Sequence, residues 1–135
     1  MSATYGYSTS EWESTREWIT RRLRKVARAR GTITYSELAG EMAVAGLIPL
    51  DPHNPALAAL LGQVNVLERE GGRPLISALV VHKGGDLEPG AGFWAFAREL
   101  GIDPGSGPHA RLDFWSRELE SCYAHWSLTK DETPR

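Results

Sequence analysis

The sequence predicts an α+β fold, a single domain with a winged helix-turn-helix-like core, an N-terminal helix and two C-terminal helices. Three observations lead to it. The pair Ile33-Thr34 is β-forming and gives a short strand, after which Ser36 caps a helix. Asn54-Pro55 starts a second helix, since a capping side chain precedes a residue whose missing N–H costs nothing there. The apolar run 74–83 then returns as a buried strand.

The flanking elements follow from caps and apolar spacing. Ser10 with Glu13 fits a capping box and Gly31 fits a stop, so the sequence predicts a first helix over 11–30. The same signals predict the rest: helices over 36–45, 55–70, 93–100 and 111–128, loops over 47–53 and 84–92, and flexible ends at 1–9 and 129–135.

Length and composition favour one domain of the reducing cytoplasm. A chain of 135 residues can bury a single core. Cys122 is the only cysteine and cannot form an internal disulfide. The longest apolar run, 75–81, is too short to cross a bilayer, and residues 1–10 lack a secretory signal. We therefore expect no membrane contact.

Charge is distributed unevenly along the chain. The net charge is −2, but residues 1–30 hold seven Lys/Arg against three Asp/Glu, and the rest hold eight against fourteen. A protein-wide basic footprint is missing, so contact with nucleic acid would depend on a local patch. The cations of the first helix either form a solvated face or attract an anionic partner; they are Arg21, Arg22, Arg24, Lys25 and Arg28.

Three short motifs within residues 32–81 carry a family resemblance. They are YSELA at 35–39, LLGQV at 60–64, and Arg73-Pro74 before the apolar run. Together they resemble the C-terminal domain of the O6-alkylguanine-DNA alkyltransferases and their alkyltransferase-like relatives. The resemblance covers residues 32–81, somewhat more than a third of the chain, and implies a winged-helix fold that contacts DNA.

Two departures from that family bear on function. Its Pro-Cys-His-Arg motif supplies the thiol that accepts an alkyl group, whereas Pro74 is followed here by Leu75, Ile76 and Ser77. Alkyl transfer is excluded, because the nucleophile is absent. Ala59 aligns with the arginine that replaces a flipped base, and its methyl group cannot hydrogen-bond. The resemblance therefore supports the fold and weakens lesion recognition.

A winged helix would offer the helix over 55–70 to the major groove. Gln63 and Asn65 are the residue types that read adenine edges, and Arg69 adds a positive charge. Glu68 and Glu70 would repel phosphate. In this hypothesis the DNA-binding residues are Arg21, Arg22, Lys25, Gln63, Asn65 and Arg69.

An aromatic run suggests a different surface. The chain has five tryptophans, and three rings within the four positions 93–96 cannot all share one face of a helix. We expect Phe93 or Trp94 to be partly exposed at a partner surface, together with Lys83 and Arg98 beside the glycine-rich loop; the alternative is that the last helix covers the rings. The sequence thus favours a non-enzymatic protein–protein adaptor or regulator, with DNA binding as the alternative.

A small hydrolytic enzyme or nuclease is the second alternative. Its candidate residues are His82, at the end of the apolar run, with Asp86 and Glu88 in the following loop. The four histidines lie apart in the sequence, and no Cys/His pair has the spacing of metal ligands. We therefore predict no catalytic residue, metal or cofactor.

Overall fold

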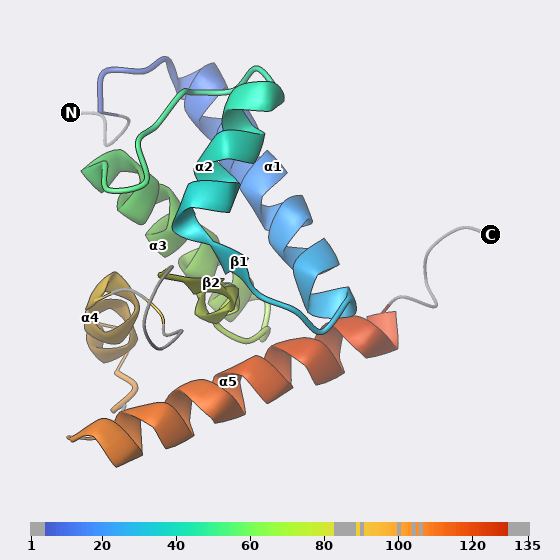
Figure 1. The fold of residues 1–135 in the computed structure, drawn as a ribbon, viewed down its shortest axis with the longest axis vertical. Coiled ribbons are helices and arrows are strands. Elements are labelled where there is room, and N and C mark those ends of the chain that lie inside the picture. The colour runs from blue at the N-terminus through green and yellow to red at the C-terminus, as the bar shows by residue number, and fades with distance from the viewer. Residues whose placement is uncertain are drawn as a thin grey trace.

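The structure is a computed structural model that describes residues 5–82, 89, 91–99, 101–103, 105 and 107–129. This part of the chain is mostly helical, with one small parallel sheet (Figure 1). The elements in chain order are α1 (Thr9–Arg28), β1 (Ile33–Thr34), α2 (Tyr35–Val44), α3 (Pro55–Glu70), the 3₁₀ helix η1 (Ile76–Leu79), β2 (Val80–Val81), α4 (Ala91–Glu99) and α5 (Pro108–Thr129).

The helices surround η1, which contacts α1, α3 and α5. Helix α1 packs against α3, and α5 runs along the lower edge of Figure 1 from beneath α4 to the C-terminal end of α1. The sheet pairs β1 with β2 in parallel, with Ile33 opposite Val80 and Thr34 opposite Val81. Within the described residues, no helix is both long enough and apolar enough to cross a membrane.

Helices α1, α2, α4 and α5 begin one to three residues earlier than the sequence predicts. The capping box of α1 is Ser8 with Glu11, not Ser10 with Glu13, and the preceding Tyr7 stacks on Trp12 with ring centroids 6.5 Å apart. This contact is a hydrophobic staple across the cap, and it fixes where α1 starts. Helix α2 is likewise capped two residues earlier, where a threonine forms a second complete capping box with a glutamate: Thr34 with Glu37.

The third helix has the predicted bounds. The Asn54 side chain accepts a hydrogen bond from the Ala56 N–H, and Pro55 occupies the first turn. At the other end, Gly72 adopts a φ of +76°, which a residue without a Cβ reaches freely. The predicted strand Ile33-Thr34 is also confirmed.

The apolar run 74–83 is not the continuous strand that its composition suggests. It forms η1 followed by a strand of only two residues. The reason is that side chains, not a neighbouring strand, satisfy its backbone polar groups. The partners come from α3 and α5: Glu118 accepts from the Leu75 N–H, Asn65 accepts from the Ser77 N–H, and the Trp115 indole donates to the Ala78 carbonyl at 2.9 Å.

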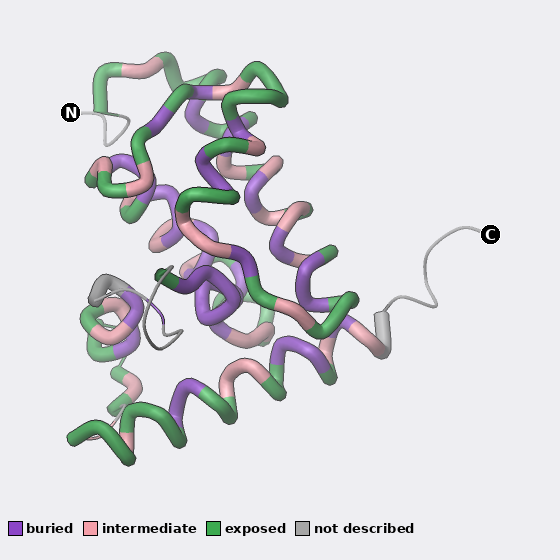
Figure 2. Tube along the Cα trace, viewed as in Figure 1, coloured by how far each residue is buried: buried purple, intermediate pink, exposed green. Residues whose placement is uncertain are grey.

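Buried side chains form two apolar clusters that meet at this segment. Figure 2 marks the buried residues along the chain. The larger cluster joins α1, α2, α3 and the second half of α5, and the smaller joins α4 to the first half of α5. The central segment contributes to both: Ile76, Leu79 and Val80 to the larger, Leu75, Ala78 and Val81 to the smaller.

Candidate functional site

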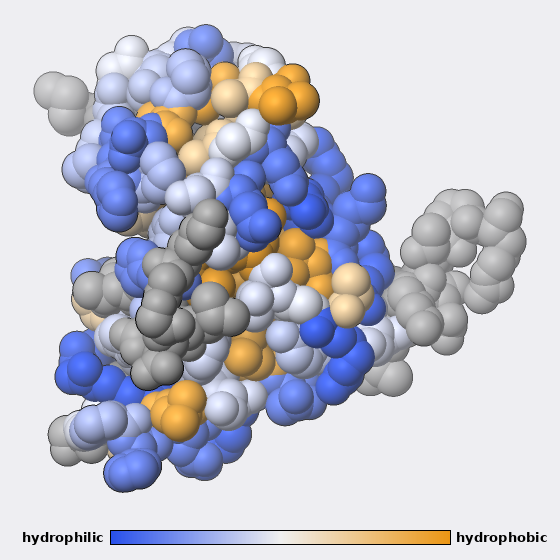
Figure 3. Space-filling view, in the orientation of Figure 1, coloured by the Kyte–Doolittle hydropathy of each residue, from blue (hydrophilic) through white to orange (hydrophobic). Residues whose placement is uncertain are grey.

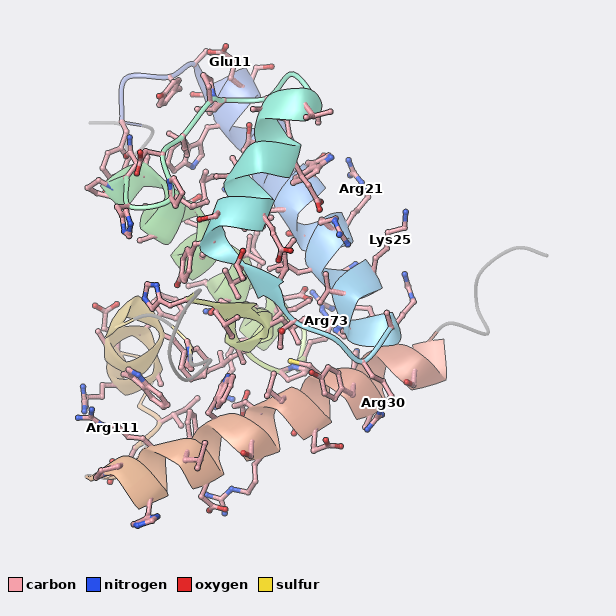
Figure 4. All side chains as sticks on the ribbon, in the orientation of Figure 1. Glu11, Arg21, Lys25, Arg30, Arg73 and Arg111 are labelled. Carbon is pink, nitrogen blue, oxygen red and sulfur yellow. The ribbon has the colours of Figure 1, made fainter. Side chains whose placement is uncertain are left out.

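The outer side of α1 carries an uncovered row of cations. The buried stripe of this helix includes Ile19, Leu23 and Val26, and it turns the intervening residues toward solvent. Arg21, Lys25 and Arg28 are exposed and follow one another at i, i+4 and i+7, so they share one side of the helix. Figure 4 shows Arg21 and Lys25 pointing away from the other helices.

These cations line an open hollow of about 400 Å³. We call this surface the basic face of α1; its lining residues are Trp18, Arg21, Arg22, Arg24, Lys25 and Arg28. In Figure 3 the edge of the molecule over α1 is largely hydrophilic. A second hollow of about 320 Å³ shares Arg21 and Arg24 and has mixed charge, because Glu17 and Glu68 line it together with Arg16 and Arg73.

Two arginines of the basic face already have carboxylate partners. Arg22 forms a two-point ion pair with Glu41 of α2, and its Nη2 lies 3.1 Å from Oε2. The hydrogen bond from Arg22 lowers the pKa of the Glu41 carboxyl, and the same bond raises the pKa of Arg22. Arg24 is paired with Glu68 of α3. The exposed trio of Arg21, Lys25 and Arg28 has no carboxylate partner among the described residues.

Glu68 is the centre of an internal clamp. Its side chain is only 1% exposed, and it accepts hydrogen bonds from Arg24 Nη2 at 2.7 Å and from Arg73 Nε at 2.8 Å. The Arg24 guanidinium also lies over the Trp126 ring, 4.4 Å from its centroid. The clamp therefore ties α1 to α3, to the segment before η1, and to α5. Since its charge is neutralised internally, Glu68 does not present the exposed repulsive carboxylate that we expected.

The structure also turns Gln63 and Asn65, the α3 residues expected to contact DNA bases, toward the protein interior. Asn65 is 1% exposed; its amide nitrogen donates to Ser77 Oγ at 2.7 Å, and its oxygen accepts from the Ser77 N–H. Gln63 is half-buried, and its oxygen accepts from the Trp12 indole and from Arg16 Nη1. These amides are occupied by the protein itself, which conflicts with their expected role at a groove.

Helix α3 is also partly covered by α4. A Cβ on Gly62 would lie 3.3 Å from the Phe96 ring, so the absence of a side chain there admits α4. Arg69 remains exposed near the end of α3. The structure therefore brings Arg21, Arg22 and Lys25 together on α1, while the α3 amides expected to read bases are engaged within the protein.

The aromatic run divides between core and surface. Phe93 is 4% exposed and packs beside Phe114 of α5, which corrects the expectation that it could form a partner surface. Trp94 is half-buried, and the Arg111 guanidinium lies 6.0 Å from its ring centroid. Arg98 is exposed. Lys83 lies outside the described residues.

Of the three residues proposed for hydrolysis, only His82 lies in the described part of the chain. His82 is exposed and stacks on Tyr35, with ring centroids 4.9 Å apart. Asp86 and Glu88 lie outside the described residues. No group of three or more potential metal ligands is found among the residues that are described.

Neither Ser77 nor Cys122 is presented as a nucleophile. Ser77 borders a cavity of about 50 Å³, room for one or two water molecules, and its hydroxyl accepts from Asn65. Burial raises the pKa of the Cys122 thiol, whose sulfur lies 3.7 Å from the Leu75 carbonyl oxygen. Both groups serve packing and hydrogen bonding.

The sequence did not predict that Trp18 lines the basic face, nor that Glu68 is paired with arginines, one of which is Arg73. A signal for Glu68 was present, since it follows Leu57, Leu61 and Val64 at the spacing of the buried stripe of α3. Nothing local marks Arg73, which reaches Glu68 only because the chain turns after α3. Comparison with family models, curated proteins and solved structures found no significant match to this chain.

Proposed function

We propose that this chain is a binding module for a polyanion, and that the basic face of α1 holds the phosphate backbone of a nucleic acid. The observation that carries the proposal is the exposed trio Arg21, Lys25 and Arg28 on one side of a helix, beside a hollow of about 400 Å³. Uncompensated cations in a row raise the local potential, although the chain as a whole has a net charge of −2.

The size of this surface fits several phosphates. Trp18 to Arg28 spans ten helical steps of about 1.5 Å each, or roughly 15 Å. One strand of a duplex carries one phosphate per about 3.4 Å of its axis, so about four phosphates lie along such a length. Because the amides of Gln63 and Asn65 are occupied, the proposed contact reads charge and not base sequence.

The winged-helix assignment belongs to the same proposal. The order β1, α2, α3, β2 supports it, and so does the resemblance over residues 32–81. In this arrangement α3 helps to build the scaffold, and α1 supplies the contact with the ligand.

The test measures binding of a short labelled DNA duplex over a series of salt concentrations. Three phosphate contacts predict a slope of about −3 for log K against log salt, or a loss of affinity of about 50-fold between about 50 and 200 mM. Arg21→Glu, Lys25→Glu and Arg28→Glu together should abolish binding while the unfolding transition is retained.

The matched control reverses three arginines of α4 and α5: Arg98→Glu, Arg111→Glu and Arg117→Glu. It changes the net charge by the same amount and should retain most of the affinity. Equal loss in both triple variants would show that only overall charge matters. No binding by the wild-type protein at low salt would reject the proposal.

A protein–protein adaptor is the second candidate. It is favoured by the half-buried Trp94, with Arg111 beside its ring, and by Leu112, which is 55% exposed on α5. It ranks second because Phe93 is buried. Trp94→Ala should then release a copurifying partner without unfolding the protein, and retention of that partner would count against the adaptor.

A further inference from the structure

Trp18 lies among the cations of the basic face. It borders the hollow together with Arg21 and Lys25, and it is half-buried, with part of the side chain packed against the larger apolar cluster. Trp18 precedes the exposed cations along α1 by about 4.5, 10.5 and 15 Å at the helical rise of about 1.5 Å. An aromatic side chain therefore stands at one end of a row of positive charges.

Trp18 differs from the other four tryptophans because its indole makes no hydrogen bond, ring stacking or cation–π contact with the described residues. Trp12 donates to Gln63 and Trp115 donates to the Ala78 carbonyl. Trp94 contacts two phenylalanines, and the Arg24 guanidinium lies over Trp126. A partly exposed indole without such a contact is available to a ligand, and tryptophan is among the residues that contribute most to binding energy at interfaces.

We propose that the basic face binds an unpaired stretch of nucleic acid, with one base stacked on Trp18 and the adjoining phosphates along Arg21, Lys25 and Arg28. This inference rests on the proposed function and names its ligand. A row of cations beside an aromatic ring is the combination that single strands use, because every base offers a flat π-face and every nucleotide a phosphate. A base within a duplex has both faces stacked and cannot reach Trp18.

The combination of cations with an indole ring in the hollow favours a nucleotide over an acidic peptide. A peptide of glutamates and aspartates would satisfy the cations, but it carries no flat ring for the indole. The two ligands are separated by asking whether the bases matter at constant charge, which an abasic strand of the same length does directly.

The experiment compares three labelled ligands at fixed salt: a single strand, an abasic strand of equal length, and a duplex. Stacking of one base predicts that the wild-type protein binds the normal strand on the order of tenfold tighter than the abasic strand. Trp18→Leu keeps an apolar side chain against the core and should remove this difference. Trp18→Phe keeps an aromatic ring and should retain part of the difference in affinity between the normal and the abasic strand.

The outcomes separate the two proposals. If no ligand binds at low salt, the proposed function fails and the inference falls with it. If all three ligands bind in a salt-dependent way, but the abasic strand binds as tightly as the normal one, the function stands and the stacking inference is wrong. Unchanged discrimination in Trp18→Leu would overturn the inference equally. Thermal unfolding of each variant confirms that the comparison is between folded proteins.

Discussion

Helices α1 and α3 pack against each other and use their polar side chains in opposite ways. On α3, Asn65 and Glu68 are buried and fully engaged with other parts of the protein. On α1, Arg21, Lys25 and Arg28 are exposed, without a carboxylate partner among the described residues. Residue types that are typical of a helix reading a DNA groove can therefore serve internal packing, as they do on α3. The exposed positive charge lies instead on α1, outside the helix pair α2–α3 that a helix-turn-helix would offer to DNA.

The largest expected effect is the loss of unfolding free energy when the clamp around Glu68 is broken. Glu68→Ala leaves Arg24 and Arg73, each about 29% exposed, facing each other without a counter-ion. Breaking a buried ion pair by removing one partner costs about 3–5 kcal/mol, and we expect the lower end because the arginines reach solvent. Urea unfolding measures it, with the exposed Glu70→Ala as the matched control. A loss below about 1 kcal/mol would show that α3 does not depend on this carboxylate.

A smaller effect is expected from the buried amide. Asn65→Ala leaves the Ser77 N–H and hydroxyl without their partners inside the core, at a cost of about 1–3 kcal/mol. Ser77→Ala removes only one of the two hydrogen bonds and should cost less. If instead Asn65→Ala were neutral in stability and weakened DNA binding, the contrast between the two helices would be wrong.

The smallest effect expected on stability comes from the ion pair between Arg22 of the basic face and Glu41. Arg22 lowers the pKa of Glu41 below its ordinary value of 4.5, so the pair stabilises the folded state above that pH. The contribution is lost as pH falls through the lowered pKa. Because Glu41 is 41% exposed, the effect should be less than about 1 kcal/mol. Unfolding of wild type and Glu41→Gln at neutral and acidic pH measures it; an equal acid sensitivity of both proteins would contradict the pairing.

Sequence patterns predicted elements well where the signals are local, and poorly where the conformation depends on residues far away in the chain. Asn54-Pro55 and the glycines after Glu70 fixed α3, because caps and stops act within a few residues. The conformation of 74–83 could not be obtained in this way. Its backbone partners Asn65, Trp115 and Glu118 lie 12 to 43 residues away in the chain, and a buried apolar run has the same composition in either conformation.

The candidate site shows the same division. The cations of α1 were visible as a cluster in the sequence, but which of them are free depends on Glu41 and Glu68 in other helices. Trp18 gave no signal in the sequence, since a tryptophan directly before Ile19 and five positions before Leu23 does not indicate whether its ring is buried or exposed. Tertiary contacts decide which polar groups bond to other parts of the protein and which stay exposed to a ligand.

The most direct test of the α1 claim is an NMR titration that follows backbone amide shifts as a short single-stranded oligonucleotide is added. We predict that the largest changes in amide shift fall on α1 between Trp18 and Arg28, and that the amide shifts of the exposed turn of α3 around Ala58 change little. Large changes centred on Ala58 and Gly62, with α1 unaffected, would contradict it and return α3 to the role of the reading helix.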